Sequence, residues 1–174
     1  VTLRVERRYG ASTIIQHISL TDGAADDRID IRTEVDWRTP RTLLKAQFPM
    51  SFTNPEVCYD LGIGTIKRGC NTPEQYEVYA QQWADMQTKD GSYGVAVLND
   101  CKYGWDKPSE NNLRLTLLHT PTADGDDFSF QKDLDIGHHR FTYSIEGTSG
   151  TYTSANMLRT GHTLNTRSLR LPAT

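Results

Sequence analysis

The amino-acid sequence predicts an all-β domain, a two-sheet antiparallel sandwich of about ten strands with at most one short helix. Three observations predict this fold. Short segments in which apolar and polar residues alternate recur along the chain. Turn residues such as Asp-Gly separate these segments at short intervals. Only Ser154–His162, closed by Gly161, suggests a helix.

The first strands are predicted to start an antiparallel meander. Residues 1–9 and 12–20 alternate between apolar and polar side chains, and Gly10 separates them. The Asp22-Gly23 turn leads to Arg28–Arg38, the clearest strand of the sequence. One side of this strand is charged and the other is apolar, so we expect one solvated and one buried face. The apolar face consists of Ile29, Ile31, Val35 and Trp37.

The middle of the chain continues this pattern with one ambiguous segment. Leu43–Met50 alternates, and Pro49 and Pro55 confine the segment that follows to a sheet edge or a connection. Glu77–Gln87 fits either a strand or a helix, and its Tyr and Trp content favours a strand.

Two apolar runs, Tyr93–Leu98 and Leu113–Leu118, are typical of strands that are covered on both faces. Phe141–Ile145 alternates again and predicts a last strong strand. No internal repeat or low-complexity linker divides the chain, so we expect a single domain over residues 1–174.

The composition is that of a soluble globular domain. Charged residues make up 24% and hydrophobic residues 36% of the 174 residues, which is too apolar for a disordered chain. The formal net charge of −3 gives no reason to expect nucleic acid or an anionic membrane as a partner. No apolar run is long enough to span a membrane. The chain begins at Val1 without a signal segment, and we expect it to be an excised piece of a longer protein.

The cysteines predict neither a disulfide framework nor a zinc knuckle. Cys58, Cys70 and Cys101 are an odd number, and none of them belongs to a CxxC pair. We expect three reduced thiols in core or loop positions.

The polar loop between the two apolar runs is the candidate functional segment. Asn99, Asp100, Lys102, Tyr103 and Trp105 concentrate hydrogen-bonding and stacking groups there. Amides, carboxylates and aromatic rings are the groups that bind a sugar. Asn and Asp also stabilise turns, however, and Tyr and Trp commonly cover the edge of a sandwich. Residue types alone therefore leave a binding loop and a structural turn equally open.

Two further polar clusters are interpreted as structural. An acidic cluster follows Pro121, and nothing apolar nearby would raise the pKa of one carboxyl above another, as a glycosidase requires. His138 and His139 are adjacent in a predicted strand, so their imidazoles point to opposite faces and do not easily share a metal ion. No nucleophile elbow, HExxH or phosphate-binding glycine loop occurs. The acidic residues are Asp124, Asp126, Asp127, Asp133 and Asp135.

A series of motifs nevertheless points to a known family. In chain order they are Val35–Arg38, Leu44-Lys45, Phe48-Pro49, Glu77-Val78, Trp83–Asp85, Tyr93–Gly104, Leu113–Pro121, the spaced pattern Asp135, Gly137, His139, Phe141, Tyr143, and Leu164-Asn165. With these motifs the chain resembles the C-terminal β-sandwich region of glycoside hydrolase family 38 α-mannosidases. The run around Asn99–Gly104 and the pattern at residues 135–143 are the most specific.

The resemblance implies a supersandwich fold, similar to galactose mutarotase, in a larger glycosidase. Family members are retaining exo-α-mannosidases with a zinc ion and an aspartate nucleophile in an N-terminal α/β domain. The implied partner is that catalytic domain of the parent chain, and the implied substrate, reached through the parent, is an α-mannoside. No cofactor is expected in this chain, and the resemblance favours a cytoplasmic location. The substrate-cleft candidates are Asn99, Asp100, Lys102, Tyr103, Trp105 and His119, where the family more often has arginine at the last position.

Two other functions stay open at this point. The chain could be a free-standing carbohydrate-binding sandwich with Tyr103 and Trp105 as its stacking platform. It could also be an assembly module whose exposed apolar patch receives another domain. Our first hypothesis is a non-catalytic domain of an α-mannosidase.

Overall fold

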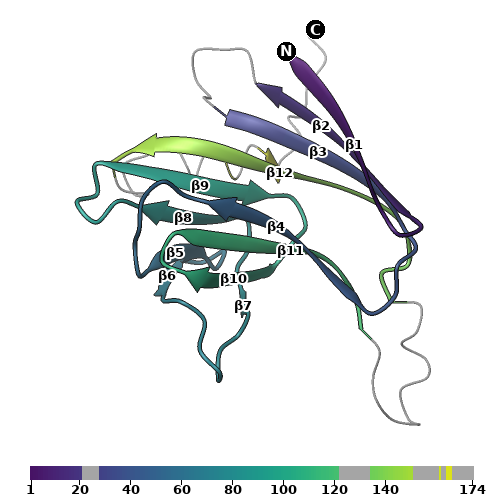
Figure 1. The fold of residues 1–174 in the computed structure, drawn as a ribbon. Helices are drawn as coiled ribbons and strands as arrows, with labels where there is room; N and C mark the ends of the chain where they lie inside the picture. The colour runs from purple at the N-terminus through teal and green to yellow at the C-terminus, as the bar shows by residue number, and fades with distance from the viewer. Residues whose placement is uncertain (21–27, 122–133, 151–160, 162–163, 166–174) are drawn as a thin grey trace, which may run out of the picture.

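The computed structural model describes residues 1–20, 28–121, 134–150, 161 and 164–165. These residues form twelve β-strands in two antiparallel sheets, so the predicted all-β sandwich is confirmed (Figure 1). The predicted helix at Ser154–His162 lies outside the described residues, except for Gly161. No helix in the described ranges is long and apolar enough to cross a membrane. The strands are β1 (Thr2–Tyr9), β2 (Ser12–Leu20), β3 (Arg28–Trp37), β4 (Thr42–Pro49), β5 (Val57–Asp60), β6 (Thr65–Arg68), β7 (Val78–Tyr79), β8 (Trp83–Gln87), β9 (Tyr93–Asn99), β10 (Gly104–Ser109), β11 (Asn112–Thr120) and β12 (Gly137–Ser149).

The two sheets differ in width. The large sheet has eight strands in the order β1-β2-β3-β12-β9-β8-β5-β6, and the small sheet has four in the order β4-β11-β10-β7. β1, β2 and β3 pair with one another as neighbours, so the predicted meander is confirmed. Residues 50–56 connect β4 to β5 across the two sheets, which agrees with the position of Pro49 and Pro55.

The main core lies between the sheets and fixes how they overlap. The Phe48 ring on β4 meets the Tyr143 ring on β12 edge to face, with 5.9 Å between the ring centroids. On the other side of the core, the ring of Trp105 on β10 meets that of Tyr59 on β5 at 6.3 Å. β4 therefore lies opposite β12, and β1, β2 and β3 extend beyond the small sheet (Figure 1).

The predicted burial of β3 and β9 is confirmed. β3 buries Ile31, Val35 and Trp37 on one face, while the charged residues of the other face stay more exposed. β9 is covered on both faces because a second apolar cluster lies on its outer side. This cluster contains Cys58, Trp83, Ala96 and Leu98, with Leu164 packed against it.

The prediction that Leu113–Leu118 is covered on both faces is wrong for the first half of the run. Leu113 and Leu115 are fully buried, but Arg114 and Thr116 point to the outer side of the small sheet and are half-buried. A register shift between Thr116 and Leu118 then buries both of the last two leucines.

The preference for a strand over a helix in Glu77–Gln87 is confirmed, but the segment forms two strands in different sheets. β7 pairs with β10 in the small sheet, whereas β8 pairs with β5 and β9 in the large sheet. Residues 80–82 cross between the sheets, and their backbone groups bond outside any ladder. The amide of Ala80 donates to the carbonyl of Tyr103 at 3.0 Å. The amide of Gln81 donates to the carbonyl of Asp60 at 2.8 Å.

The three cysteines are free thiols, as expected. Cys58 is buried, Cys70 is half-buried and Cys101 is exposed. They therefore occupy core and loop positions.

A charged cluster holds the outer face of the small sheet together. The carboxylate of Asp106 on β10 is fully buried and binds Arg114 of β11 and Lys45 of β4. The side-chain amide of Asn71 donates to the same carboxylate at 3.1 Å. Burial raises the pKa of Asp106, but the hydrogen bonds from Arg114, Lys45 and Asn71 outweigh it and lower the pKa overall. Three of the four strands are thus joined through one side chain.

Replacing Asp106 by alanine should lower the free energy of unfolding by about 3–5 kcal/mol, because Lys45 and Arg114 would lose their buried counter-charge. Urea denaturation at pH 7 measures this loss. Because the pKa of Asp106 is lowered, its contribution is complete above the ordinary pKa near 4 and is lost as the pH falls further. Glu77→Ala is the matched control: Glu77 bonds to Lys45 at 3.3 Å but is one-third exposed, and we expect a loss of about 1 kcal/mol or less. Equal losses in the two variants would contradict this account.

Candidate functional site

The segment Asn99–Trp105 is the passage from the large sheet to the small sheet. Asn99 ends β9, and Gly104 begins β10 in the other sheet. The Asn99 side chain is buried, and it donates from Nδ2 to the carbonyl of Gln81 at 2.9 Å. Its Oδ1 accepts the amide of Lys102 at 2.6 Å. Both ends of the Asn99 amide therefore shape the passage itself.

Asp100 extends the pairing of the large sheet by one further residue. Its amide donates to the carbonyl of Thr142 at 3.1 Å, and its Oδ2 accepts the amide of Thr142 at 2.9 Å. The C-terminal segment is attached at the same place, because Nδ2 of Asn165 donates to the carbonyl of Asn99 at 3.0 Å. These bonds fix the end of β9 to β12 and to Asn165.

The remaining loop residues divide into packed and exposed side chains. The Lys102 ammonium lies 4.5 Å from the centre of the Phe141 ring, a cation–π contact. Trp105 has no exposed surface, so it cannot form the sugar-stacking platform of the second hypothesis. Tyr103 is 53% exposed and presents its ring to solvent.

His119 does not join the loop. It lies near the end of β11, and its amide donates to Oδ2 of Asp135 at 2.7 Å, just before β12 begins at Gly137. The loop instead bonds to Thr142, five residues into β12, or about 17 Å further along that strand. The six predicted cleft residues are thus split: His119 lies beside the start of β12, and the loop that holds the other five is bound to the middle of β12.

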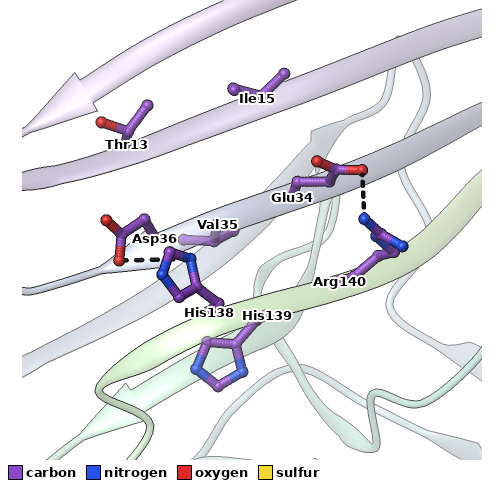
Figure 2. Close-up of a pocket in the computed structure, with 8 residues that line it drawn as sticks. All are labelled: Thr13, Ile15, Glu34, Val35, Asp36, His138, His139 and Arg140. Atoms are coloured by element: carbon purple, nitrogen blue, oxygen red, sulfur yellow. Dashed lines mark ion pairs between the residues drawn. The ribbon is translucent and has the colours of Figure 1, made fainter.

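The two adjacent histidines point apart, as predicted (Figure 2). His138 lies on the outer face of the large sheet, with Nδ1 3.7 Å from Oδ1 of Asp36. His139 turns away from it, and its Nε2 is 2.9 Å from the carbonyl oxygen of Asp135. A hollow of about 520 Å³ borders this outer face, where Arg140 also pairs with Glu34 of β3 at 3.2 Å. Within the described ranges, no group of three or more His, Cys, Asp or Glu side chains could hold a metal ion.

Sequence reasoning missed the buried carboxyl of Asp85. Asp85 is 2% exposed, and neither carboxylate oxygen has a hydrogen-bond partner among the residues that the structure describes. Burial raises the pKa of Asp85 to about 7; the amide of Gln87 opposes the shift and the charge of Glu146 adds to it. Gln87 itself donates from Nε2 to the carbonyl of Gly150 at 2.9 Å. The sequence pattern that could have revealed Asp85 is an aspartate between the apolar residues of a strand that is buried on both faces.

Comparison with known protein families identifies the type of domain. The model of the family described as "Glycosyl hydrolases family 38 C-terminal domain" matches residues 1–127. Alpha-mannosidase 2C1 of Mus musculus is 32% identical over 150 residues, which cover 83% of this chain. Alpha-mannosidase G of Dictyostelium discoideum is 33% identical over 158 residues, which cover 88% of this chain.

These relatives are much longer than this chain. The matched residues make up 14% of the Mus musculus protein and 13% of the Dictyostelium discoideum protein. A solved structure, an alpha-mannosidase from Enterococcus faecalis V583, has the same fold, with a TM-score of 0.73 at 12% identity. That similarity covers 87% of this chain and 17% of the solved one.

The opposite environments of Trp105 and Tyr103 predict opposite effects on stability. Trp105→Ala should lower the free energy of unfolding by about 3–5 kcal/mol, because it empties a fully buried site in the main core. Tyr103→Ala, the matched control two residues away, should change it by about 0.5 kcal/mol or less. Urea denaturation measures both. A stable Trp105→Ala variant would show that the crossover does not depend on this core contact.

The raised pKa of Asp85 predicts that stability falls as the pH rises. The folded protein keeps a proton on Asp85 up to about pH 7, whereas the unfolded chain releases it near its ordinary pKa of about 4. The stabilising contribution is therefore complete below about pH 4 and lost through pH 7. Asp85→Asn should flatten this slope and stabilise the protein at pH 8 by up to about 4 kcal/mol. Thermal unfolding between pH 4 and 8 tests this, with the exposed Asp90→Asn as a control that keeps the slope.

Proposed function

The chain belongs to the glycosyl hydrolase family 38 C-terminal domain family, and from this premise we propose that it is the non-catalytic C-terminal domain of an α-mannosidase. In this proposal the parent enzyme hydrolyses terminal α-mannosides, and the sandwich packs against its catalytic domain. The observation that carries the proposal is a largely apolar sheet face that no other described strand covers. Leu3, Tyr9 and Leu20 lie on the core side of β1 and β2, yet they are 59%, 57% and 60% exposed.

The exposed face continues the main core of the sandwich. In the strand register, Leu3 lies beside Ile18, and Ile18 lies beside Ile31 of the main core. Tyr9 stacks on the buried Trp37 at 6.2 Å between ring centroids. An apolar surface that is continuous with a core is what a tightly packed neighbouring domain would cover. This favours a domain within a larger enzyme over a free-standing module.

We place the catalytic chemistry in the other domain. The zinc ion and the aspartate nucleophile that the family resemblance implies belong to that catalytic domain. In this proposal the residues of this chain carry out no step of the hydrolysis. The crossover between the sheets already engages three of the predicted residues: Asn99 and Asp100 through hydrogen bonds, and Trp105 through burial in the core. A contribution to the substrate cleft would come from Tyr103 or His119, whose side chains are exposed.

The 174-residue chain should not hydrolyse an aryl α-mannoside, with or without added zinc, whereas a longer chain that includes the catalytic domain should. A chromogenic assay measures both proteins at equal concentration. Turnover by the 174-residue chain alone would overturn the proposal. Calorimetric titration with mannose oligosaccharides separates the second hypothesis: binding heat that disappears in Tyr103→Ala would instead indicate a carbohydrate-binding module.

A further inference from the structure

Three hollows form a continuous groove along the free side of β4, which we call the β4 groove. Their volumes are about 420, 360 and 410 Å³. Leu43–Lys45 line the first, Leu44–Phe48 the second and Gln47–Met50 the third, so consecutive hollows share residues of β4. The groove therefore follows this strand from one end to the other.

The groove exposes the backbone edge of β4. Alternate residues of a strand point to opposite faces of its sheet. Ala46 packs against the main core, whereas Lys45 points to the outer face and binds Asp106. Lys45, Ala46 and Gln47 nevertheless line the same hollow. Because consecutive residues on opposite faces border it, the hollow must lie along the edge of the strand, between the two faces. Among the described strands, β4 is the terminal strand of the small sheet and pairs with β11 alone, so the N–H and C=O groups on its other side have no partner strand there.

The ceiling of the groove is a largely apolar part of the large sheet. Ile14 and Ile18 of β2 and Ile31 of β3 line the same hollow as β4, together with the polar side chains of Arg7, Gln16 and Thr33. Because β4 lies opposite β12, three strands of the large sheet extend past it. At about 4.8 Å between neighbouring strands, this overhang is about 14 Å wide. Such a space accommodates one to three further strands of the small sheet.

We propose that a β-strand of the same α-mannosidase chain, from outside these 174 residues, occupies the β4 groove. It pairs with the free edge of β4 and places alternate apolar side chains against Ile14, Ile18 and Ile31. This inference rests on the proposed function, and it specifies how the domain joins the rest of the enzyme. The extension would widen the small sheet beneath β3, β2 and β1.

Two observations favour a strand of the parent chain as the occupant of the β4 groove. Edge strands that stay open usually carry an exposed lysine or another protecting device. The only lysine of β4, Lys45, is 10% exposed and is paired with Asp106, so its charge does not protect the edge. The matched relatives, in addition, are about seven times as long as the region shared with this domain, since that region is 13–14% of their length, and the rest is an ample source of a strand.

Hydrogen–deuterium exchange with mass spectrometry tests the proposal by comparing the 174-residue chain with a longer chain that includes the catalytic domain. Among Thr42–Phe48, the amides that face the free edge of β4 should exchange at least about tenfold more slowly in the longer chain. Amides of β11, which already pairs with β4 and β10 in the short chain, are the internal control and should change much less. Unchanged exchange in β4 would overturn the proposal.

The other outcomes separate this inference from the proposed function. If β1 and β2 gain protection in the longer chain while β4 does not, the domain packs against its neighbour without strand addition, and only this inference fails. If none of these strands gains protection, both fail. If β4 of the short chain becomes protected as its concentration rises and its mass doubles, the occupant is a second copy, which also overturns the inference.

A matched pair of variants locates the contact. Ile18 and Ile15 lie on opposite faces of β2: Ile18 lines the β4 groove, and Ile15 borders the hollow on the outer face. In the longer chain, Ile18→Lys should remove the protection of β4, because a charge would enter the apolar ceiling. Ile15→Lys should preserve it. Equal exchange in the two variants would place the occupant elsewhere.

Discussion

The structure depends on one constraint: the apolar face of an eight-stranded sheet needs a cover, and the small sheet provides only four strands. The core side of the large sheet is mainly apolar from Leu3 on β1 to Tyr59 on β5, with one polar network of Arg7, Gln16, Thr33 and Tyr143 within it. β4 ends the cover opposite β12. Beyond β4, the core side of the outer strands of the large sheet is exposed. The unequal overlap of the two sheets therefore produces both the main core and the exposed face of β1 and β2.

The loop with the richest functional chemistry is used to turn the chain. Asn99 and Asp100 resemble sugar-binding residues in composition, but their partners are the backbone groups of Gln81, Lys102 and Thr142. Passing from one sheet to the other interrupts the ladders, and the freed amides and carbonyls then need new partners. Short polar side chains provide them. The density of polar residues in this segment is thus explained by topology.

Sequence periodicity predicted the strands whose environment is uniform along their length. β3 and the middle of β12 alternate because one face meets the core and the other meets solvent. It indicated strand for Glu77–Gln87 but did not reveal that the chain changes sheet there, because both halves have strand-like composition. The contacts of the loop could not be predicted for a related reason: the partner of Asp100 is 42 residues away, and no local pattern reveals such a contact. The burial of Trp105 is likewise a tertiary property.

The two buried aspartates lie in different sheets and differ in their hydrogen bonding, and the one in the small sheet, Asp106, stabilises the edge strand β4. Within the described part of the chain the carboxylate of Asp85 accepts no hydrogen bond and its pKa rises, whereas Asp106 accepts several and its pKa falls. Asp106 binds Lys45 of β4 although β11 lies between their strands, so the edge strand is held to the sheet by a buried ion pair as well as by its ladder. An edge fixed in this way loses little conformational entropy when another strand pairs with it. The charged cluster on one face therefore makes the backbone edge beside it a rigid template.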